Sequence, residues 1–267
     1  MPETKNDSSA CRPPVAYRNQ EFLDSREGRS IRILSEYLQP LGHLRREKVH
    51  DTVVFFGSAR TGEDGPMGRY YRDARELARK FTEWSDSITH SDRRFVVTTG
   101  GGPGIMEAAN RGAHDAGGKS IGFNIGLPFE QAPNPYITPD LCFEFHYFFM
   151  RKFWFAYLAK ALVVFPGGFG TLDELTEILT LTQTGKLMKK MVVILYGTGF
   201  WKEVVNFDAL VKYGTISKDD LNLFQFADNP DEALAILQDG LTRHYLDPDV
   251  PLPEPELETP AIAKSRL

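Results

Sequence analysis

Two glycine-rich turns are the segments of the sequence best suited to bind a ligand. Residues 100–104 read Gly-Gly-Gly-Pro-Gly and residues 166–171 read Pro-Gly-Gly-Phe-Gly-Thr, each between a β-rich run and a helical pattern. Glycine lets a backbone approach a phosphate closely, and the N–H groups and dipole of a helix start favour an anion there. Thr171 adds a hydroxyl, which makes the second turn the stronger phosphate candidate. One such turn alone would indicate only a tight connection, whereas two at one sheet edge favour ligand binding.

Charged residues stand on both sides of the second turn. The segment 171–177 reads Thr-Leu-Asp-Glu-Leu-Thr-Glu, and the helix dipole alone is enough to explain Asp173. Glu174 falls about one turn after the phosphate-binding N–H groups, in the direction that a ribose held there by its 5′-phosphate would extend. Arg151 and Lys152 lie on the preceding helical segment, where they could bind a ligand or form a solvated stripe on an otherwise aromatic helix.

Other nucleotide and enzyme motifs fail when their spacing is checked. Ile105 stands where the dinucleotide fingerprint needs its third glycine. Residues 118–120, Gly-Lys-Ser, resemble the end of a Walker A loop, but Ala113 replaces its first glycine and a strand follows instead of a helix. The chain has no His-Glu-x-x-His and no Gly-x-Ser-x-Gly, which argues against zinc-protease and α/β-hydrolase sites. None of the six His or two Cys has metal-ligand spacing, so we expect no metal.

Short β-rich runs alternate with helical patterns over most of the chain. We predict strands at 53–56, 95–98, 120–125, 141–145, 161–165 and 191–195. We predict helices at 70–84, 105–116, 149–160, 171–184, 201–213 and 230–244. This alternation is typical of a parallel sheet covered on both faces, so the predicted fold class is α/β, a Rossmann-like doubly wound parallel sheet.

The two ends of the chain differ from its middle. Residues 1–18 are polar and contain proline, and an apolar pattern at 30–48 predicts a helix that Pro40 should kink or divide. Proline recurs from 248 to 260, which is typical of a tail without its own core. We therefore predict an N-terminal arm and helix at 1–48, a Rossmann-like nucleotide-binding catalytic domain at 49–246 and a polar tail at 247–267.

Composition limits the partners of the chain. Its 267 residues suffice for one substantial core, and 31 Lys+Arg against 36 Asp+Glu give a net charge of −5. This mild acidity offers no global attraction for nucleic acid or an anionic membrane. The start is polar and lacks the apolar core of a signal peptide, and the aromatic run 143–155 is interrupted by charges. We expect a cytoplasmic protein that binds neither nucleic acid nor membrane.

Residues 166–174 match the PGGxGTxxE signature of the Lonely-Guy (LOG) family of phosphoribohydrolases, often labelled "lysine decarboxylase-like". Arg151 and Lys152 occupy the paired Arg-Lys position of that family, and 174 − 151 = 23 residues separate the arginine from the motif glutamate. The chain resembles the family over roughly residues 51–213.

The resemblance implies hydrolysis of the N-glycosidic bond of a nucleoside 5′-monophosphate to a free base and ribose 5-phosphate. It assigns Arg151 and Glu174 as the catalytic pair. A carboxylate there would stabilise oxocarbenium character on the ribose or orient water. The resemblance and the loops imply substrate or phosphate contacts at Gly57, Ser58, Gly100, Gly101, Gly102, Gly104, Met106, Glu130, Lys152, Gly167, Gly168, Phe169, Gly170, Thr171, Leu172, Asp173 and Thr180.

The resemblance also implies at least a homodimer, with substrate sites near the subunit interface. No lysine has the setting of a Schiff-base residue, so we expect no pyridoxal phosphate and no other cofactor. The rival interpretation is a non-catalytic carrier of a nucleotide or a pterin cofactor on the same fold. A third is a structural or regulatory oligomer whose glycine loops only make turns. The base preference stays open among adenine, including cytokinin ribosides, guanine and pyrimidines.

Overall fold

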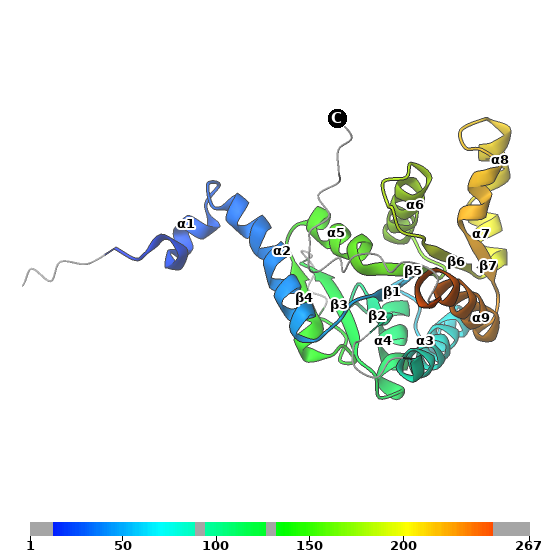
Figure 1. The fold of residues 1–267 in the computed structure, drawn as a ribbon, viewed down its shortest axis with the longest axis horizontal. Coiled ribbons are helices and arrows are strands. Elements are labelled where there is room, and N and C mark those ends of the chain that lie inside the picture. The colour runs from blue at the N-terminus through cyan, green and yellow to red at the C-terminus, as the bar shows by residue number, and fades with distance from the viewer. Residues whose placement is uncertain (1–12, 89–93, 127–131, 248–267) are drawn as a thin grey trace, which may run out of the picture.

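The structure, a computed structural model, describes residues 13–88, 94–126 and 132–247 (Figure 1). Seven strands form one sheet in the order β4-β3-β2-β1-β5-β6-β7, and every neighbouring pair is parallel. The strands are β1 (Thr52–Phe56), β2 (Val96–Thr99), β3 (Ser120–Ile125), β4 (Cys142–Phe145), β5 (Ala159–Val164), β6 (Val192–Tyr196) and β7 (Gln225–Ala227). The predicted doubly wound α/β fold is confirmed.

Continuous apolar runs form the central strands because both faces of the sheet are covered. In β1, Val54 and Phe56 point into the core shared with α2, α5 and α6, whereas Val53 and Phe55 point into the core shared with α3, α4 and α9. All five residues of β1 and all six of β5 are buried. Alternate side chains of one strand therefore serve two separate cores.

The helices that cover the sheet follow the predicted alternation. The main ones are α2 (Arg29–Arg46), α3 (Gly68–Ile88), α4 (Ile105–Asp115), α5 (Phe148–Leu158), α6 (Phe169–Gln183), α7 (Thr198–Val204), α8 (Phe207–Lys212) and α9 (Pro230–Leu241). A short helix α1 (Gln20–Asp24) lies at the far end of α2, away from the sheet (Figure 1). Within the three described ranges, no helix combines the length and apolarity that crossing a bilayer requires.

Pro40 does not divide α2, so of the predicted kink or division the division is wrong. A proline inside a helix leaves the carbonyl four residues earlier without its usual N–H partner. Here that carbonyl belongs to Glu36, and Trp154 Nε1–H of α5 donates to it at 3.0 Å. The Glu36 carboxylate in turn accepts the backbone N–H groups of His146 and Tyr147 just before α5. Contacts with α5 thus replace the lost helical hydrogen bond.

Other predicted elements also need correction. The helix predicted at 149–160 ends at Leu158, because β5 begins at Ala159. The predicted helix 201–213 is two helices, and the Asn206 side chain caps the second by accepting the Ala209 N–H at 2.9 Å. The helix predicted at 230–244 ends as an α-helix at 241 and continues as a π-helical turn, Thr242–Leu246. The edge strand β7 was not predicted.

The strand order fixes where a ligand can bind. β1 lies between β2 and β5, so the chain leaves β1 toward one side of the sheet and returns on the other. This reversal is a topological switch point, and the crevice at the carboxyl ends of these strands is where doubly wound sheets bind ligands.

Candidate active site

Three loops meet at the switch point and are hydrogen-bonded to one another. The Ser58 N–H, after β1, donates to the Pro166 carbonyl after β5 at 3.0 Å. The Ser58 carbonyl accepts the Ile105 N–H at the start of α4, 3.1 Å away. Gly104 makes this possible, since its φ is +70° and a Cβ there would lie 2.3 Å from the Ser58 oxygen. The loops after β1, β2 and β5 therefore form one packed floor.

A cleft of about 810 Å³ opens above this floor. It has the volume typical of a small-molecule site. Fourteen residues predicted from the sequence line it: Gly57, Ser58, Gly100, Gly102, Met106, Arg151, Gly167, Gly168, Phe169, Gly170, Thr171, Leu172, Asp173 and Glu174. The cleft thus collects residues from four separate parts of the sequence.

The PGGFGT turn opens α6 two residues earlier than predicted. The helix begins at Phe169 with Gly168 as its N-cap, and the Thr171 N–H already bonds to the Gly168 carbonyl at 3.0 Å. Thr171 therefore lies inside the first turn, with Oγ1 only 2.1 Å from where a Cβ on Gly167 would be. The N–H groups of Phe169 and Gly170 come before the first hydrogen-bonded N–H group of α6. N–H groups at such a helix start favour the binding of an anion.

Arg151 is held at the inner end of the cleft. Its Nε–H donates to the Phe123 carbonyl at 2.9 Å, and its guanidinium lies 5.2 Å from the Phe155 ring centroid. A Cβ on Gly100 would lie 2.6 Å from Arg151 Nη2, so only glycine leaves room for this arrangement. Burial lowers the pKa of Arg151, against the opposing charges of Glu174 and Glu144.

Glu174 is a buried carboxylate in the cleft wall, 8% exposed. Burial raises its pKa, while the charges of Lys152 and Arg151 act in the opposite direction. Lys152 Nζ lies 3.4 Å from Glu174 Oε1 and 2.7 Å from carboxylate oxygens of Asp173 and Glu177. Burial opposes the charge of Lys152, but the hydrogen bonds to Asp173 and Glu177 outweigh it and raise its pKa. A carboxylate of raised pKa beside two cations can accept a proton or stabilise positive charge.

Some predicted site residues lie outside the cleft lining. Gly101 and Gly104 belong to the same loop but are packed into the floor. Lys152 and Thr180 line a separate shallow depression on the outer side of α6, with Asp173 common to both. Glu130 lies outside the described residues.

Eight residues that sequence reasoning missed also line the cleft: Phe56, Ala59, Arg60, Asn124, Ile125, Phe148, Phe200 and Val204. Arg60 had a local signal, because it lies in the same loop as Ser58, whose Oγ accepts its backbone N–H at 3.0 Å. Its guanidinium forms no ion pair with any described residue. Asn124 also had a signal, as a polar residue at the carboxyl end of an apolar strand.

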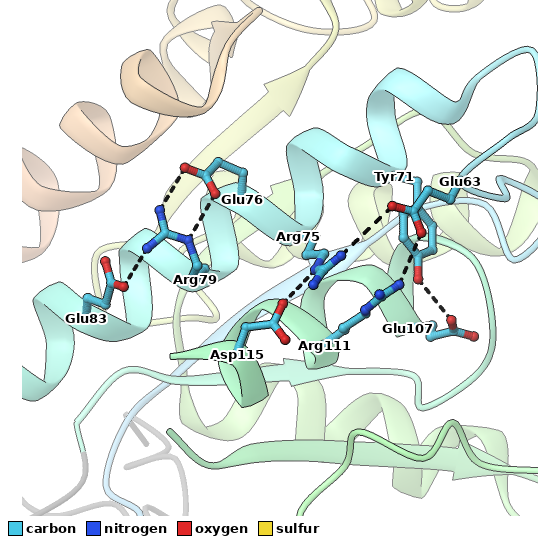
Figure 2. Close-up of polar contacts among 9 residues, drawn as sticks. All are labelled: Glu63, Tyr71, Arg75, Glu76, Arg79, Glu83, Glu107, Arg111 and Asp115. Atoms are coloured by element: carbon cyan, nitrogen blue, oxygen red, sulfur yellow. Dashed lines mark hydrogen bonds and ion pairs between the residues drawn. The ribbon is translucent and has the colours of Figure 1, made fainter. Parts of the chain in front are cut away.

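The far end of the Arg60 loop is anchored to α3 and α4 by ion pairs (Figure 2). Glu63 Oε2 lies 3.1 Å from Arg111 Nη1 of α4, and Glu63 Oε1 lies 3.9 Å from Arg75 Nη1 of α3. Arg75 also pairs with Asp115 of α4 at 2.6 Å. Single surface pairs stabilise little, but a connected network holds a loop in one place better than an isolated pair does. The loop that carries Ser58 and Arg60 is thus fixed at both ends.

Across the described ranges, no group of three or more His, Cys, Asp or Glu side chains is arranged to hold a metal ion. The charged groups of the cleft are Arg60, Arg151, Asp173 and Glu174, with Lys152 beside them. The chemistry open to them is anion binding and acid–base or electrostatic stabilisation.

A parallel doubly wound sheet with its cleft at the switch point defines a Rossmann-like α/β protein. Residues 106–237 match the family model described as "Possible lysine decarboxylase". The chain is 30% identical over 178 residues to the cytokinin riboside 5′-monophosphate phosphoribohydrolase LOG of Oryza sativa subsp. japonica, covering 66% of this chain and 67% of that one. It is 28% identical to the phosphoribohydrolase LOG2 of Arabidopsis thaliana, over 72% of this chain and 84% of the relative. The chain therefore belongs to the Lonely-Guy family.

A solved structure of similar fold agrees with this assignment of the architecture. The X-ray structure of the structural-genomics target TM1055 superposes with a TM-score of 0.50 at 24% identity, over 71% of this chain and 99% of the other. The molybdenum-cofactor (Moco) carrier protein of Chlamydomonas reinhardtii gives a TM-score of 0.48 at 21% identity, over 72% and 98%. The first of these likenesses supports the fold alone, and the second carries no argument.

Proposed function

We propose that this protein hydrolyses the N-glycosidic bond of nucleoside 5′-monophosphates with an AMP-like base. The hydroxyl of water is added to C1′ of the ribose, and the base leaves with the bonding electron pair and takes up a proton. The products are the free base and ribose 5-phosphate. Phosphoribohydrolase is the activity in the names of the curated relatives.

The observation that carries the proposal is the buried Glu174 carboxylate next to Arg151 and Lys152. Burying a charged carboxylate costs free energy, and the charge of Lys152 only partly offsets this cost, since the pKa of Glu174 stays raised. A helix dipole interaction would need only an exposed acid, such as Asp173, whose side chain is 58% exposed. The placement of Glu174 is therefore what catalysis needs and a simple turn does not.

Each part of the cleft has a role in the proposed reaction. The start of α6 binds the 5′-phosphate and fixes the ribose over Glu174. Glu174 stabilises the oxocarbenium character of the ribose and orients the attacking water, for which its raised pKa suits it as a base. Arg151 stabilises negative charge on the leaving base. Its hydrogen bond to the Phe123 carbonyl orients the guanidinium, and Nη2 lies close to Gly100.

The test is incubation of the pure protein with AMP, GMP, CMP, UMP and IMP, followed by chromatography for released base. Release of base with equal ribose 5-phosphate supports hydrolysis, and the Glu174→Gln variant must lose it. Binding of a nucleotide without release of base would contradict the proposal and favour the carrier interpretation.

We also propose that the protein acts in the cytoplasm as a homodimer. Phe148, Phe149 and Phe153 of α5 are exposed by 37–53%, next to the depression formed by Lys152 and Thr180. Large exposed apolar side chains in one patch are typical of an interaction surface. A second copy packed on this face would bring its residues close to the first copy's cleft, since Phe148 belongs to both.

A further inference from the structure

Asn124 is a buried amide at the inner end of the cleft. It lies near the carboxyl end of β3 and is only 5% exposed, yet it belongs to the cleft lining. Buried side-chain amides normally have partners for both their nitrogen and their oxygen. The two halves of the Asn124 amide differ in this respect.

Neighbouring acceptors fix the orientation of the amide. Asn124 Nδ2–H donates to the Phe143 carbonyl of β4 at 3.1 Å, and the same nitrogen lies 3.4 Å from Cys142 Sγ and 3.5 Å from the Gly122 carbonyl. A carbonyl can only accept, so the nitrogen must face β4. The oxygen faces the 100–104 loop, where a Cβ on Gly101 would lie 2.1 Å from Oδ1.

No described residue donates a hydrogen bond to Asn124 Oδ1. Among the described residues, the buried side-chain atoms without a partner are Thr52 Oγ1 and Tyr196 Oη, so Asn124 Oδ1 keeps contact with solvent in the cleft and is open to a ligand that donates a hydrogen bond. The Nε–H of Arg151, which also lines the cleft, donates to the carbonyl of Phe123, the residue before Asn124. The cleft therefore presents a fixed hydrogen-bond acceptor at this point.

The distance between Asn124 and the phosphate site suits the two ends of a nucleotide. The start of α6 follows β5, and β3 is separated from β5 by β2 and β1. Three strand spacings amount to about 14 Å. Arg151 and Glu174 line the same cleft, and the proposal places the ribose and the glycosidic bond beside them. Met106 and Ile125 also line the cleft and add apolar surface for the faces of a base.

We propose that Asn124 Oδ1 accepts a hydrogen bond from the exocyclic amino group of the base and so selects amino bases over keto bases. Adenine presents N6–H₂ and cytosine N4–H₂ as donors, whereas guanine, hypoxanthine and uracil present a keto oxygen at the corresponding edge. The keto oxygen of such a base and Asn124 Oδ1 are both acceptors and repel each other. An adenine with one N6 substituent keeps one N–H group, so it can still donate to Asn124 and bind. This inference rests on the proposed function for the identity of the ligand as a nucleotide.

Matched substrate pairs test the proposal on the wild-type protein. The pairs are AMP with IMP and CMP with UMP. Within each pair the ring size is the same, and one member has an amino group where the other has a keto group. We expect kcat/KM to favour the amino member of each pair by about 10- to 100-fold, the range for a specific base contact. N6-methyl-AMP should stay a substrate, whereas N6,N6-dimethyl-AMP and purine riboside 5′-monophosphate should lose as much as IMP does. Equal kcat/KM within the pairs would overturn the role of Asn124 while leaving nucleosidase activity intact.

Binding measurements separate this proposal from the proposed function. Calorimetry with AMP and IMP on the Glu174→Gln variant measures affinity without turnover. If AMP binds more tightly than IMP but the wild type releases no base, the role of Asn124 in base selection is supported and the proposed hydrolysis is overturned. Binding of neither nucleotide would overturn both.

A pair of variants then assigns the selectivity to Asn124. Asn124→Ala should bring the AMP to IMP ratio to about one. Asn134→Ala is the matched control, because Asn134 is also a buried amide, 7% exposed, that bonds to the Gly101 and Gly102 carbonyls but does not itself line the cleft. It should lower stability and keep the ratio. An unchanged ratio in a folded Asn124→Ala protein overturns the proposal, and if that variant does not fold, the substrate series decides it.

Discussion

Lys152 Nζ lies 3.4 Å from Glu174 Oε1 and joins α5 to α6 through three carboxylates. Arg151, the preceding residue on α5, lines the cleft together with Glu174. The charge of Lys152 is the largest influence that keeps the pKa of Glu174 from rising further with burial. Lys152 therefore controls both the position and the ionisation of the proposed catalytic carboxylate.

Lys152→Met should move the acid limb of the pH–rate profile to higher pH. Glu174 must be ionised to act, so activity falls as pH drops through its pKa, and loss of the lysine charge raises that pKa. Lys152→Arg keeps the charge and should leave the limb in place. The measurement is kcat/KM for AMP between pH 4 and 9. A limb that stays in place or moves down in Lys152→Met would contradict this coupling.

Glu174→Gln should lower kcat by ~10²-fold or more, the scale of positioned acid–base or electrostatic groups. Gln keeps the size and polarity of the side chain, so KM and folding should change little. Arg151→Ala should also lose activity, mainly in kcat if the guanidinium serves the leaving base. Steady-state kinetics of the folded variants checks both. Wild-type turnover by Glu174→Gln would leave the carboxylate with a structural role only.

Glu174→Gln also has a predictable effect on the stability of the folded protein. A carboxyl whose pKa is raised in the folded state binds more protons there than in the unfolded chain, so the wild type loses stability as pH rises from the unfolded pKa through the folded one. Gln cannot ionise and lacks this loss. Glu174→Gln should therefore gain Tm relative to the wild type as pH rises across that window, as thermal unfolding at pH 4 to 8 would measure. A relative Tm that falls with pH would mean that Lys152 and Arg151 outweigh burial.

The sequence predicted the parts of the fold that local patterns control. Apolar runs such as 53–56 and 191–195 marked buried strands, and the 100–104 and 166–171 turns marked the sheet edge. The break at Asn206 had a local signal as well, because asparagine is a preferred N-cap. The three-residue strand β7 had no local signal, since so short an edge strand shows no alternation of apolar and polar residues.

The composition of the cleft was less predictable. Asn124, Phe200 and Val204 reach it only because the strand order brings the carboxyl ends of β3, β1, β5 and β6 to one crevice. No spacing along the chain encodes that juxtaposition. Thr180 is the opposite case, a residue predicted to contact substrate that does not line the cleft. It lies two turns beyond Glu174 on α6, and in a single chain it is on the outer side of that helix.

Gly100→Ala should impair catalysis by displacing Arg151. The new Cβ would lie 2.6 Å from Arg151 Nη2 and 2.8 Å from Met106 Sδ, so the guanidinium must move. We expect kcat/KM to fall by about 10²-fold, as a ~1 Å misplacement of a positioned group can cause. Gly199→Ala is the control, because nothing lies within 4 Å of its Cβ position on α7. Equal activity of the two variants would show that Arg151 does not depend on this space.

The proposed dimer should be sensitive to the apolar face of α5. Phe149→Asp places a charge where a second copy would bury an aromatic ring, and this side chain is 49% exposed in the single chain. Light scattering should show twice 30.1 kDa for the wild type and a monomer for the variant. Glu83→Asp, on the opposite side of the sheet, should leave the mass unchanged. A fully active wild-type monomer would contradict the dimer.

Arg60→Ala should weaken recognition of the 5′-phosphate more than any step of bond cleavage. The other cations of the site already interact with carboxylates, since Lys152 pairs with three of them and the charges of Glu174 and Glu144 act on Arg151. Arg60 has no such partner among the described residues, so its guanidinium is available to a dianionic phosphate at the start of α6. We expect KM for AMP to rise by about 10-fold, the value of a charge-assisted hydrogen bond, with kcat nearly unchanged. Arg60→Lys should recover part of the loss because it keeps the charge but not the planar fork. Turnover of adenosine, which has no phosphate, should be the same in wild type and variant, so an equal loss for AMP and adenosine would show that Arg60 acts on the shape of the loop and not on the phosphate.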